Sequence, residues 1–108
     1  MDAEAYLVAV PNVLYEESDE IVPFFQSVSD GIKLPLIIQD LEFNGPGLNM
    51  RTIEALRGVL PTLLGMKIET IPAGPKYTAI RQAFGKDFFV AGGWAIMQMI
   101  EALDRGVD

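Results

Sequence analysis

The sequence contains no cysteine and no histidine. Without cysteine, the chain can form neither a disulfide bond nor a thiolate zinc site. Without histidine, it lacks the commonest metal ligand and the usual general base of serine and cysteine nucleophiles. We therefore expect no metal site, no cofactor and no triad-type catalysis.

Positive charge is also scarce, since 8 Lys and Arg stand against 15 Asp and Glu for a net charge of −7. The cations are scattered singly, which argues against a nucleic-acid partner, because phosphate binding needs clustered cations. No apolar run approaches the ~20 residues that cross a bilayer, and residues 1–4 lack a signal-peptide pattern. We expect a cytoplasmic protein with no membrane partner.

What the sequence does have is a large apolar fraction, 50% of 108 residues, which predicts one domain over residues 1–108. Continuous apolar runs are typical of strands buried on both faces of a parallel sheet. Four such runs are Tyr6–Val10, Leu34–Asp40, Leu63–Met66 and Phe88–Ala91.

A helical pattern follows each expected strand. Ser18 and Asn49 are suited to cap the first two helices, and Gly31, Gly85 and Gly106 to end the first, third and fourth. In the last helix, Ile96, Met97, Ile100 and Leu103 are expected to form the apolar face. The four helices are predicted over Ile21–Val28, Met50–Leu60, Lys76–Phe84 and Trp94–Arg105.

The expected strands begin 25 to 31 residues apart, which is the size of a βα unit. The fold class is therefore α/β with four consecutive βα units. These units fit either an open flavodoxin-like sandwich or half of a (β/α)₈ TIM barrel. Both architectures place function in the loops at the carboxyl ends of the strands.

Lys67 lies at the carboxyl end of an expected strand, directly after Leu63–Met66. A lysine there either extends out of the sheet into solvent or is held neutral by apolar walls. A neutral amine can attack a ketone and form a Schiff base. Glu69 has the same strand parity and either faces the same pocket or is a solvated loop carboxylate.

Two other strand ends carry candidate site residues. Gln39 and Asp40 end the preceding strand, where a pocket would supply the partners that buried polar groups need, although Asp40 also suits a turn. Gly92 and Gly93 allow close backbone approach before a helix, which suits a bound carboxylate or phosphate, or form an ordinary turn. Trp94 is expected in the core or an interface.

Four segments carry a resemblance to a known family: Val10-Pro11, Leu34–Asp40, Leu64–Glu69 and Gly92-Gly93. Their order and spacing are similar to those of the dihydrodipicolinate synthase / N-acetylneuraminate lyase superfamily of class I Schiff-base lyases. The resemblance covers nearly the whole chain, and Gly65-x-Lys67 is its most specific part.

The resemblance implies strands four to seven of a (β/α)₈ barrel, with Lys67 as the Schiff-base lysine and Gly92 lining the pocket. Gln39 stands where the family has its proton-relay tyrosine, and Asn12 and Val13 replace tyrosines after strand four. The arginine of the synthase has no counterpart in the loop 41–48. Dihydrodipicolinate synthesis itself is therefore not expected.

The pattern is closer to the 2-keto-3-deoxy sugar-acid dehydratase branch, especially 2-keto-3-deoxyarabonate dehydratase. This branch implies a lyase acting on a small 2-keto acid. Its catalytic residues would be Lys67, Gln39 and Glu69, and its substrate-binding residues would be Asp40, Gly92, Gly93 and Asn12.

The family's other strands lie outside this sequence. We therefore expect a homo-oligomer that closes a pseudo-barrel, or a piece of a longer polypeptide. The alternative function is a non-catalytic fragment or degenerate paralogue that acts as a structural or binding module. A flavodoxin-like receiver or nucleotide domain is weaker, because Pro11–Leu14 is neither acidic nor glycine-rich.

Overall fold

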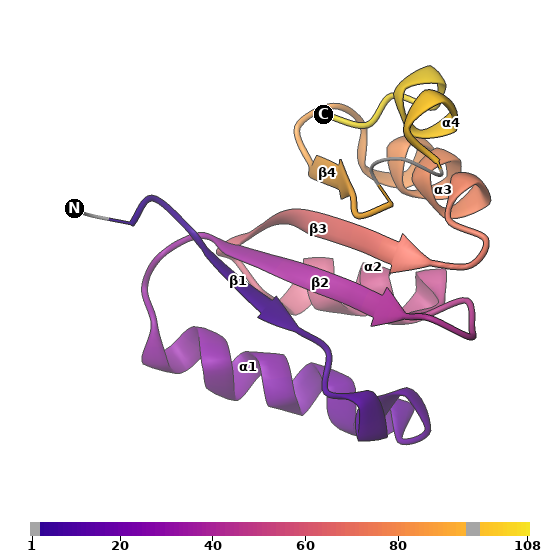
Figure 1. Cartoon of the computed structure of the whole chain (residues 1–108). Helices are drawn as coiled ribbons and strands as arrows, with labels where there is room; N and C mark the ends of the chain where they lie inside the picture. The colour runs from indigo at the N-terminus through magenta and orange to yellow at the C-terminus, as the bar shows by residue number, and fades with distance from the viewer. Residues whose placement is uncertain (1–2, 95–97) are drawn as a thin grey trace.

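The computed structural model describes residues 3–94 and 98–108, in which strands and helices alternate along the chain (Figure 1). Two short 3₁₀ helices follow the first strand. The elements are β1 (Tyr6–Ala9), η1 (Asn12–Tyr15), η2 (Ser18–Glu20), α1 (Ile21–Gly31), β2 (Leu36–Glu42), α2 (Met50–Val59), β3 (Leu63–Thr70), α3 (Gly74–Phe84), β4 (Phe89–Gly92) and α4 (Met99–Asp104).

The four strands form one parallel sheet in the order β1-β2-β3-β4, which confirms the α/β class. A flavodoxin-like sheet would have the order 2-1-3-4-5, with a reversal that places helices on both faces. Here the order follows the sequence, so right-handed crossovers bring successive helices to the same face. The sheet is singly wound.

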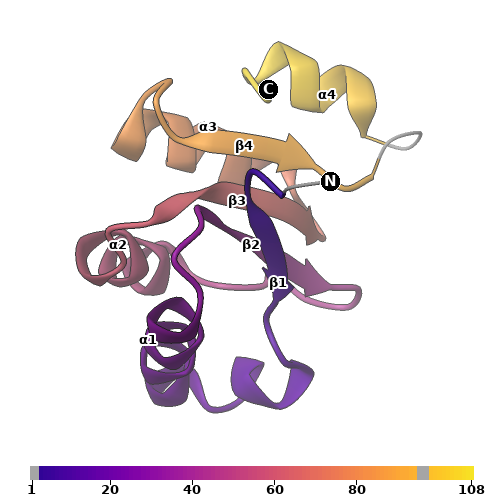
Figure 2. The ribbon, with the colours of Figure 1, turned by 90° about the vertical axis from the view of Figure 1, so that its left-hand side faces the viewer.

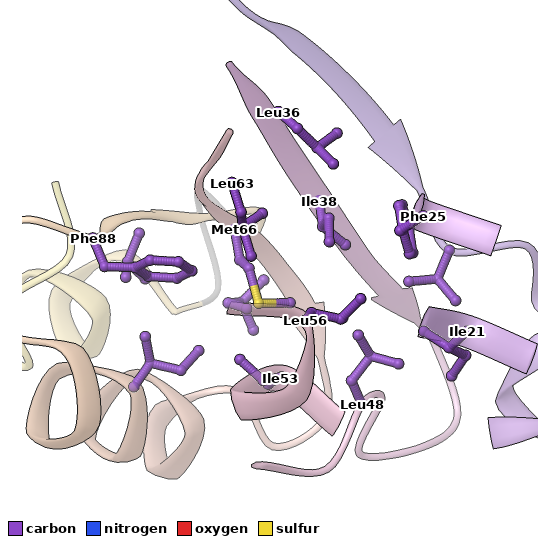
Figure 3. Packing of buried hydrophobic residues seen from close by; sticks show 14 of the residues in the cluster. Ile21, Phe25, Leu36, Ile38, Leu48, Ile53, Leu56, Leu63, Met66 and Phe88 are labelled. Atoms are coloured by element: carbon purple, nitrogen blue, oxygen red, sulfur yellow. The ribbon is translucent and has the colours of Figure 1, made fainter. Parts of the chain in front are cut away.

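One face of the sheet is covered by helices. Figures 1 and 2 show α1 and α2 along the same side of the strands, and α3 joins the same core through Tyr77 and Ile80. Figure 3 shows how side chains of α1 and α2 meet those of β2 and β3 in this layer. Each large apolar side chain buried there contributes roughly 1.5–3 kcal/mol. The members labelled in Figure 3 are Ile21, Phe25, Leu36, Ile38, Leu48, Ile53, Leu56, Leu63, Met66 and Phe88.

The other face of the sheet is not buried, so the expectation of strands buried on both faces is wrong. In β2, Leu36 and Ile38 are fully buried against the helices, whereas Ile37 and Gln39, which alternate with them, are only half-buried. Leu7 in β1, which pairs in register with Ile37, is 48% exposed. We call the side that carries Leu7, Ile37, Gln39, Lys67 and Glu69 the open face.

Three of the predicted helix ends are confirmed. Asn49 Oδ1 accepts a hydrogen bond from the Thr52 amide at 2.8 Å, as an N-cap does. Gly85 follows α3 with φ of +72°, and Gly106 follows α4 with φ of +83°, a conformation that favours glycine. Helix α3 begins at Gly74, two residues before the predicted start, because Pro75 is tolerated in a first turn.

Two predicted ends of α1 are wrong. Ser18 begins η2, whose 3₁₀ turn runs directly into α1, so the N-cap is Glu20 and makes no side-chain cap. Gly31 is the last residue of α1, and the chain leaves the helix at Ile32 in an extended conformation with φ of −134°.

The last helix is shorter than predicted, since α4 covers only Met99–Asp104 instead of Trp94–Arg105. Ala102 is its buried residue, whereas Ile100 and Leu103 are 83% and 62% exposed, so their predicted core positions are wrong. A helix of six residues can bury only a narrow strip. The predictions for Ile96 and Met97 lie outside the described residues.

Candidate functional site on the open face of the sheet

Lys67 and Glu69 lie side by side on the open face, because residues two apart in a strand project to the same side. Lys67 Nζ is 2.7 Å from Glu69 Oε1. The Lys67 side chain is 35% exposed and the Glu69 side chain 14% exposed. In the sheet, Lys67 pairs in register with Gln39 of β2 and Ala91 of β4. The amine is therefore near the middle of the sheet's width.

Gln39 completes a three-residue group. Its amide Nε2 donates to Glu69 Oε1 at 2.7 Å, so one carboxylate oxygen interacts with both the amide and the Lys67 ammonium. The structure thus brings together Lys67, Gln39 and Glu69, the three residues predicted to be catalytic. We call them the Lys67 group. An amine beside a carboxylate has a partner to which it can pass a proton.

Gly93 lies directly against the Lys67 group. A Cβ at this position would be 1.5 Å from Glu69 Cγ, so only glycine leaves room for the Glu69 side chain. The Gly93 amide donates to the Ile68 carbonyl at 2.8 Å, which holds the loop after β4 beside β3. Of the two predicted glycines, Gly93 is the one at the site.

Gly92 does not face the Lys67 group. A Cβ on Gly92 would be 3.1 Å from the Tyr77 hydroxyl and 3.5 Å from Ala102, on the helix-covered side. The prediction that these glycine amides open a helix is also wrong, because α4 begins only at Met99. The alternation of side chains explains why adjacent glycines face opposite sides.

Asp40 is on the other side of the sheet from Gln39, so the structure does not bring it to the Lys67 group. Its side chain is fully buried and is 2.7 Å from Lys76 Nζ. The Tyr15 hydroxyl donates to Asp40 Oδ1 at 2.9 Å, and the Leu48 amide donates to Oδ1 at 3.1 Å. Burial, followed by the charge of Asp40, raises the pKa of Tyr15.

This Asp40 cluster ties four segments together, because its partners come from η1, the loop after β2 and α3. Lys76 is only 10% exposed and also donates to the Pro46 carbonyl. Every contact satisfies another buried group, which indicates a structural clamp. The sequence pattern did not single out Lys76, since a lysine in a first helical turn usually reaches solvent.

Asn12 is placed apart from the group as well. It is the first residue of η1, it is exposed, and no hydrogen bond joins its side chain to the Lys67 group among residues 3–94 and 98–108. The turn into η1 carries the chain away from the open face immediately after β1.

Sequence reasoning missed an aromatic pair at the carboxyl end of the sheet. The rings of Phe43 and Trp94 have centroids 5.6 Å apart with an interplanar angle of 68°. The Trp94 indole Nε1 donates to the Thr70 carbonyl at 3.1 Å, and Phe43 is 58% exposed. Phe43 lies in the turn after β2 and Trp94 follows β4, so strand alternation gave no signal for this contact.

A cleft of about 670 Å³ lies elsewhere, beside α3 and the chain after α4, and is lined by Arg81, Lys86, Asp104 and Arg105 among others. It contains no member of the Lys67 group. Within the described ranges, no three acidic side chains converge as metal ligands would. Likewise, none of the described helices combines the length and apolar character that crossing a membrane requires.

Comparison with known proteins adds no relative: the chain matches no family model, no curated protein and no solved structure. The chemistry of the site must therefore be argued from the site itself. It is an amine with an adjacent carboxylate and amide on the open face of the sheet. Lys67 is the fifth of the 8 residues of β3, so the prediction that it ends this strand is wrong.

Proposed function

We propose that Lys67 is the Schiff-base lysine of a lyase that acts on a 2-keto acid. The observation that carries the proposal is the Lys67 group itself, in which Nζ is 2.7 Å from Glu69 Oε1 and Gln39 Nε2 is 2.7 Å from the same atom. Lys67 lies in the second half of β3, and active sites of singly wound parallel sheets lie toward the carboxyl ends of the strands. The resemblance to the dihydrodipicolinate synthase superfamily agrees with this proposal.

The chemistry can be written with these three side chains. Lys67 passes a proton to Glu69, and its neutral amine attacks the C2 ketone carbon. Glu69 returns this proton to the carbinolamine hydroxyl, which leaves as water, and an iminium forms between Nζ and C2. In a dehydratase, Glu69 then accepts the C3 proton to give an enamine, and the C4 hydroxyl takes that proton and leaves as water. In an aldolase, the C4 hydroxyl of the iminium adduct instead gives its proton to Glu69 as the C3–C4 bond breaks. Gln39 holds Glu69 in place and carries no proton.

We further propose that the sheet is half of a (β/α)₈ barrel, with the open face as the barrel interior. The sequential strand order and the helices on one face support this reading. Half-exposed Leu7 and its neighbour Ile37 would then be interior positions. A second copy of this chain, or further strands of a longer polypeptide, would close the barrel and complete the pocket around Lys67.

Borohydride trapping tests the lyase proposal. The protein is incubated with pyruvate and with a 2-keto-3-deoxy sugar acid, reduced with sodium borohydride, and analysed by intact mass and peptide mapping. We expect a stable secondary amine on Lys67, its loss in Lys67→Ala, and its retention in Lys86→Ala. Lys86 is a suitable control because it is exposed and distant from the group. An adduct that survives Lys67→Ala, or the absence of any adduct, would refute the proposal.

A structural or binding module remains the second candidate, and the ion pair favours it. The Lys67 ammonium is already matched by Glu69, as it is in a purely structural pair. This candidate predicts that neither the wild type nor Lys67→Met forms an adduct. It also predicts that Lys67→Met alters self-association through the open face. Trapping and sedimentation on the same variant therefore separate the two functions.

A further inference from the structure

The geometry points to a second binding site, a pocket between β4 and α4 that takes a small uncharged molecule with one hydrogen-bonding oxygen. The pocket has a volume of about 210 Å³, and no member of the Lys67 group lines it. An apolar cavity of about 150 Å³ is large enough for benzene. A six-membered ring that carries one oxygen substituent therefore has a suitable size. The inference does not depend on the proposed function of Lys67.

Small residues on the two facing elements leave this space. Gly92 in β4 has no side chain, and a Cβ there would be 3.1 Å from the Tyr77 hydroxyl and 3.5 Å from Ala102 Cβ. Ala102 is the buried residue of α4 and also lines the pocket. Met99 and Leu103 of α4 line it too, and they are 53% and 62% exposed, so the pocket reaches the protein surface.

The Tyr77 hydroxyl is the polar group that the pocket offers to a ligand. The Tyr77 side chain is fully buried, and its hydroxyl has no hydrogen-bond partner among residues 3–94 and 98–108. Two other polar groups of the lining are already bonded, since Trp94 Nε1 donates to the Thr70 carbonyl and Asp108 Oδ2 accepts from the Val90 amide. Leaving a buried hydroxyl unpaired costs free energy, so a ligand oxygen that pairs with Tyr77 recovers this cost on binding.

The electrostatic surroundings favour a neutral ligand. Burial, followed by the charges of Glu101 and Glu69, raises the pKa of Tyr77. The hydroxyl therefore stays protonated at neutral pH and can donate to a ligand oxygen. Among the described residues that line the pocket there is no lysine or arginine to bind an anion. The walls are largely apolar, so a cation would lose its hydration there. A neutral alcohol, ketone or amide meets these conditions.

Helix α4 is fixed beside the pocket by contacts at its C-terminal end. Arg105 Nη1 donates to Thr78 Oγ1 of α3 at 2.8 Å. The Asp108 amide donates to the Val90 carbonyl of β4 at 2.8 Å, and Asp108 Oδ2 accepts from the Val90 amide at 2.9 Å. Because both α3 and β4 hold this end of the chain, the walls of the pocket keep their positions when a ligand arrives.

The first test uses Trp94, which lines the pocket and is the single tryptophan of the chain. Its fluorescence is titrated with cyclohexanol, which cannot form a Schiff base. We expect a saturable change in wild type and in Lys67→Ala, and none with cyclohexanecarboxylate near neutral pH. A wild-type protein without a saturable response to cyclohexanol would overturn the site. Equally strong binding of the carboxylate would overturn the assignment to a neutral ligand.

Two variants test the hydroxyl and the space separately. Tyr77→Phe removes the hydroxyl and should weaken cyclohexanol binding about five- to tenfold, as loss of one hydrogen bond does. Ala102→Leu fills the pocket and should abolish the response. Ala55→Leu, at an exposed position of α2, is the matched control and should leave it unchanged. Wild-type affinity in Tyr77→Phe or in a folded Ala102→Leu would contradict the proposed site.

Urea denaturation gives a readout that needs no ligand. Because the Tyr77 hydroxyl has no partner in the described part of the chain, Tyr77→Phe should not lower the urea midpoint. A lowered midpoint would show that the hydroxyl bonds to the protein and would overturn its role as the ligand's partner. The same measurement establishes whether Ala102→Leu folds, and if it does not, the Tyr77→Phe titration alone decides the site.

Discussion

Lys67 Nζ and Glu69 Oε1 are 2.7 Å apart on the same face of β3, two residues from each other in the strand. The pair is neither fully buried nor fully solvated, and it lies on the open face. In the proposed chemistry these two side chains have separate roles, the amine as nucleophile and the carboxylate as base. The first prediction separates these roles.

Glu69→Gln should keep the borohydride adduct, because Lys67 is still present, but lose proton transfer. Removing a positioned general base typically costs about 10²–10⁴ in rate. Exchange of the pyruvate methyl hydrogens with deuterium, followed by NMR, should therefore slow by about 100-fold or more. Glu101→Gln on exposed α4 is the control and should leave exchange unchanged. Unimpaired exchange in Glu69→Gln would exclude Glu69 as the base.

Asp40→Ala should strongly destabilise the fold. It leaves Lys76 buried without a counter-ion and removes the partners of the Tyr15 hydroxyl and the Leu48 amide. Breaking a buried pair in this way costs about 3–5 kcal/mol of unfolding free energy, measured by urea denaturation. Glu101→Ala breaks the exposed pair with Arg105 and should cost less than about 1 kcal/mol. Similar costs for the two variants would argue against the clamp.

The open face should be the surface through which copies of the chain associate. Leu7→Lys combined with Ile37→Lys places two charges among its apolar residues. Each such side chain buried at an interface contributes roughly 1.5–3 kcal/mol, so we expect the dimer dissociation constant to rise at least about tenfold. Sedimentation velocity measures this change, with Val59→Lys on α2 as the control. A wild-type protein that sediments as a monomer at every concentration would contradict the prediction.

Acid should weaken the contact between the end of the chain and β4. Asp108 Oδ2 accepts from the Val90 amide at 2.9 Å and from Arg81 Nη2 at 2.6 Å. The amide contributes most, and together they lower the pKa of Asp108 below its ordinary value of 3.8. A depressed folded-state pKa means that this stabilisation is present above about pH 4 and is lost as pH falls through the folded-state pKa.

Asp108→Asn should therefore lower the unfolding free energy near neutral pH, and the difference from wild type should shrink in acid. Because the Asp108 side chain is 43% exposed, we expect less than about 1 kcal/mol. Urea unfolding of both proteins at about pH 6 and at about pH 2.5 measures it. Asp104→Asn, on the exposed side of α4, should show no such pH dependence. A difference that grows in acid would reverse the sign and contradict the linkage.

Local patterns were sufficient for most of the architecture. Apolar runs at βα spacing predicted all four strands and their parallel arrangement, and Asn49, Gly85 and Gly106 predicted three helix ends. These features depend on neighbours within a few residues, which a sequence displays directly. The same patterns failed at Ser18 and in α4, where a 3₁₀ turn and the shortness of the helix override local preference.

Some contacts of the candidate site likewise follow from local sequence patterns, and others do not. Strand parity alone places Lys67 and Glu69 on one face, and a single sequence is enough to predict it. Which residues of other strands join them depends on register, because a shift of one residue exchanges the two faces. In the observed register, Gln39 lies on the open face and donates to Glu69, whereas Asp40 lies on the other face and pairs with Lys76.

By itself, the sequence determined a parallel α/β sheet with an amine in its third strand, since composition and periodicity are local properties. Only the tertiary structure decided that one sheet face is open, that Gly93 and not Gly92 lies against Glu69, and that Phe43 meets Trp94. Those contacts join segments far apart in the chain. Their formation depends on the register of the sheet and on the handedness of each crossover connection.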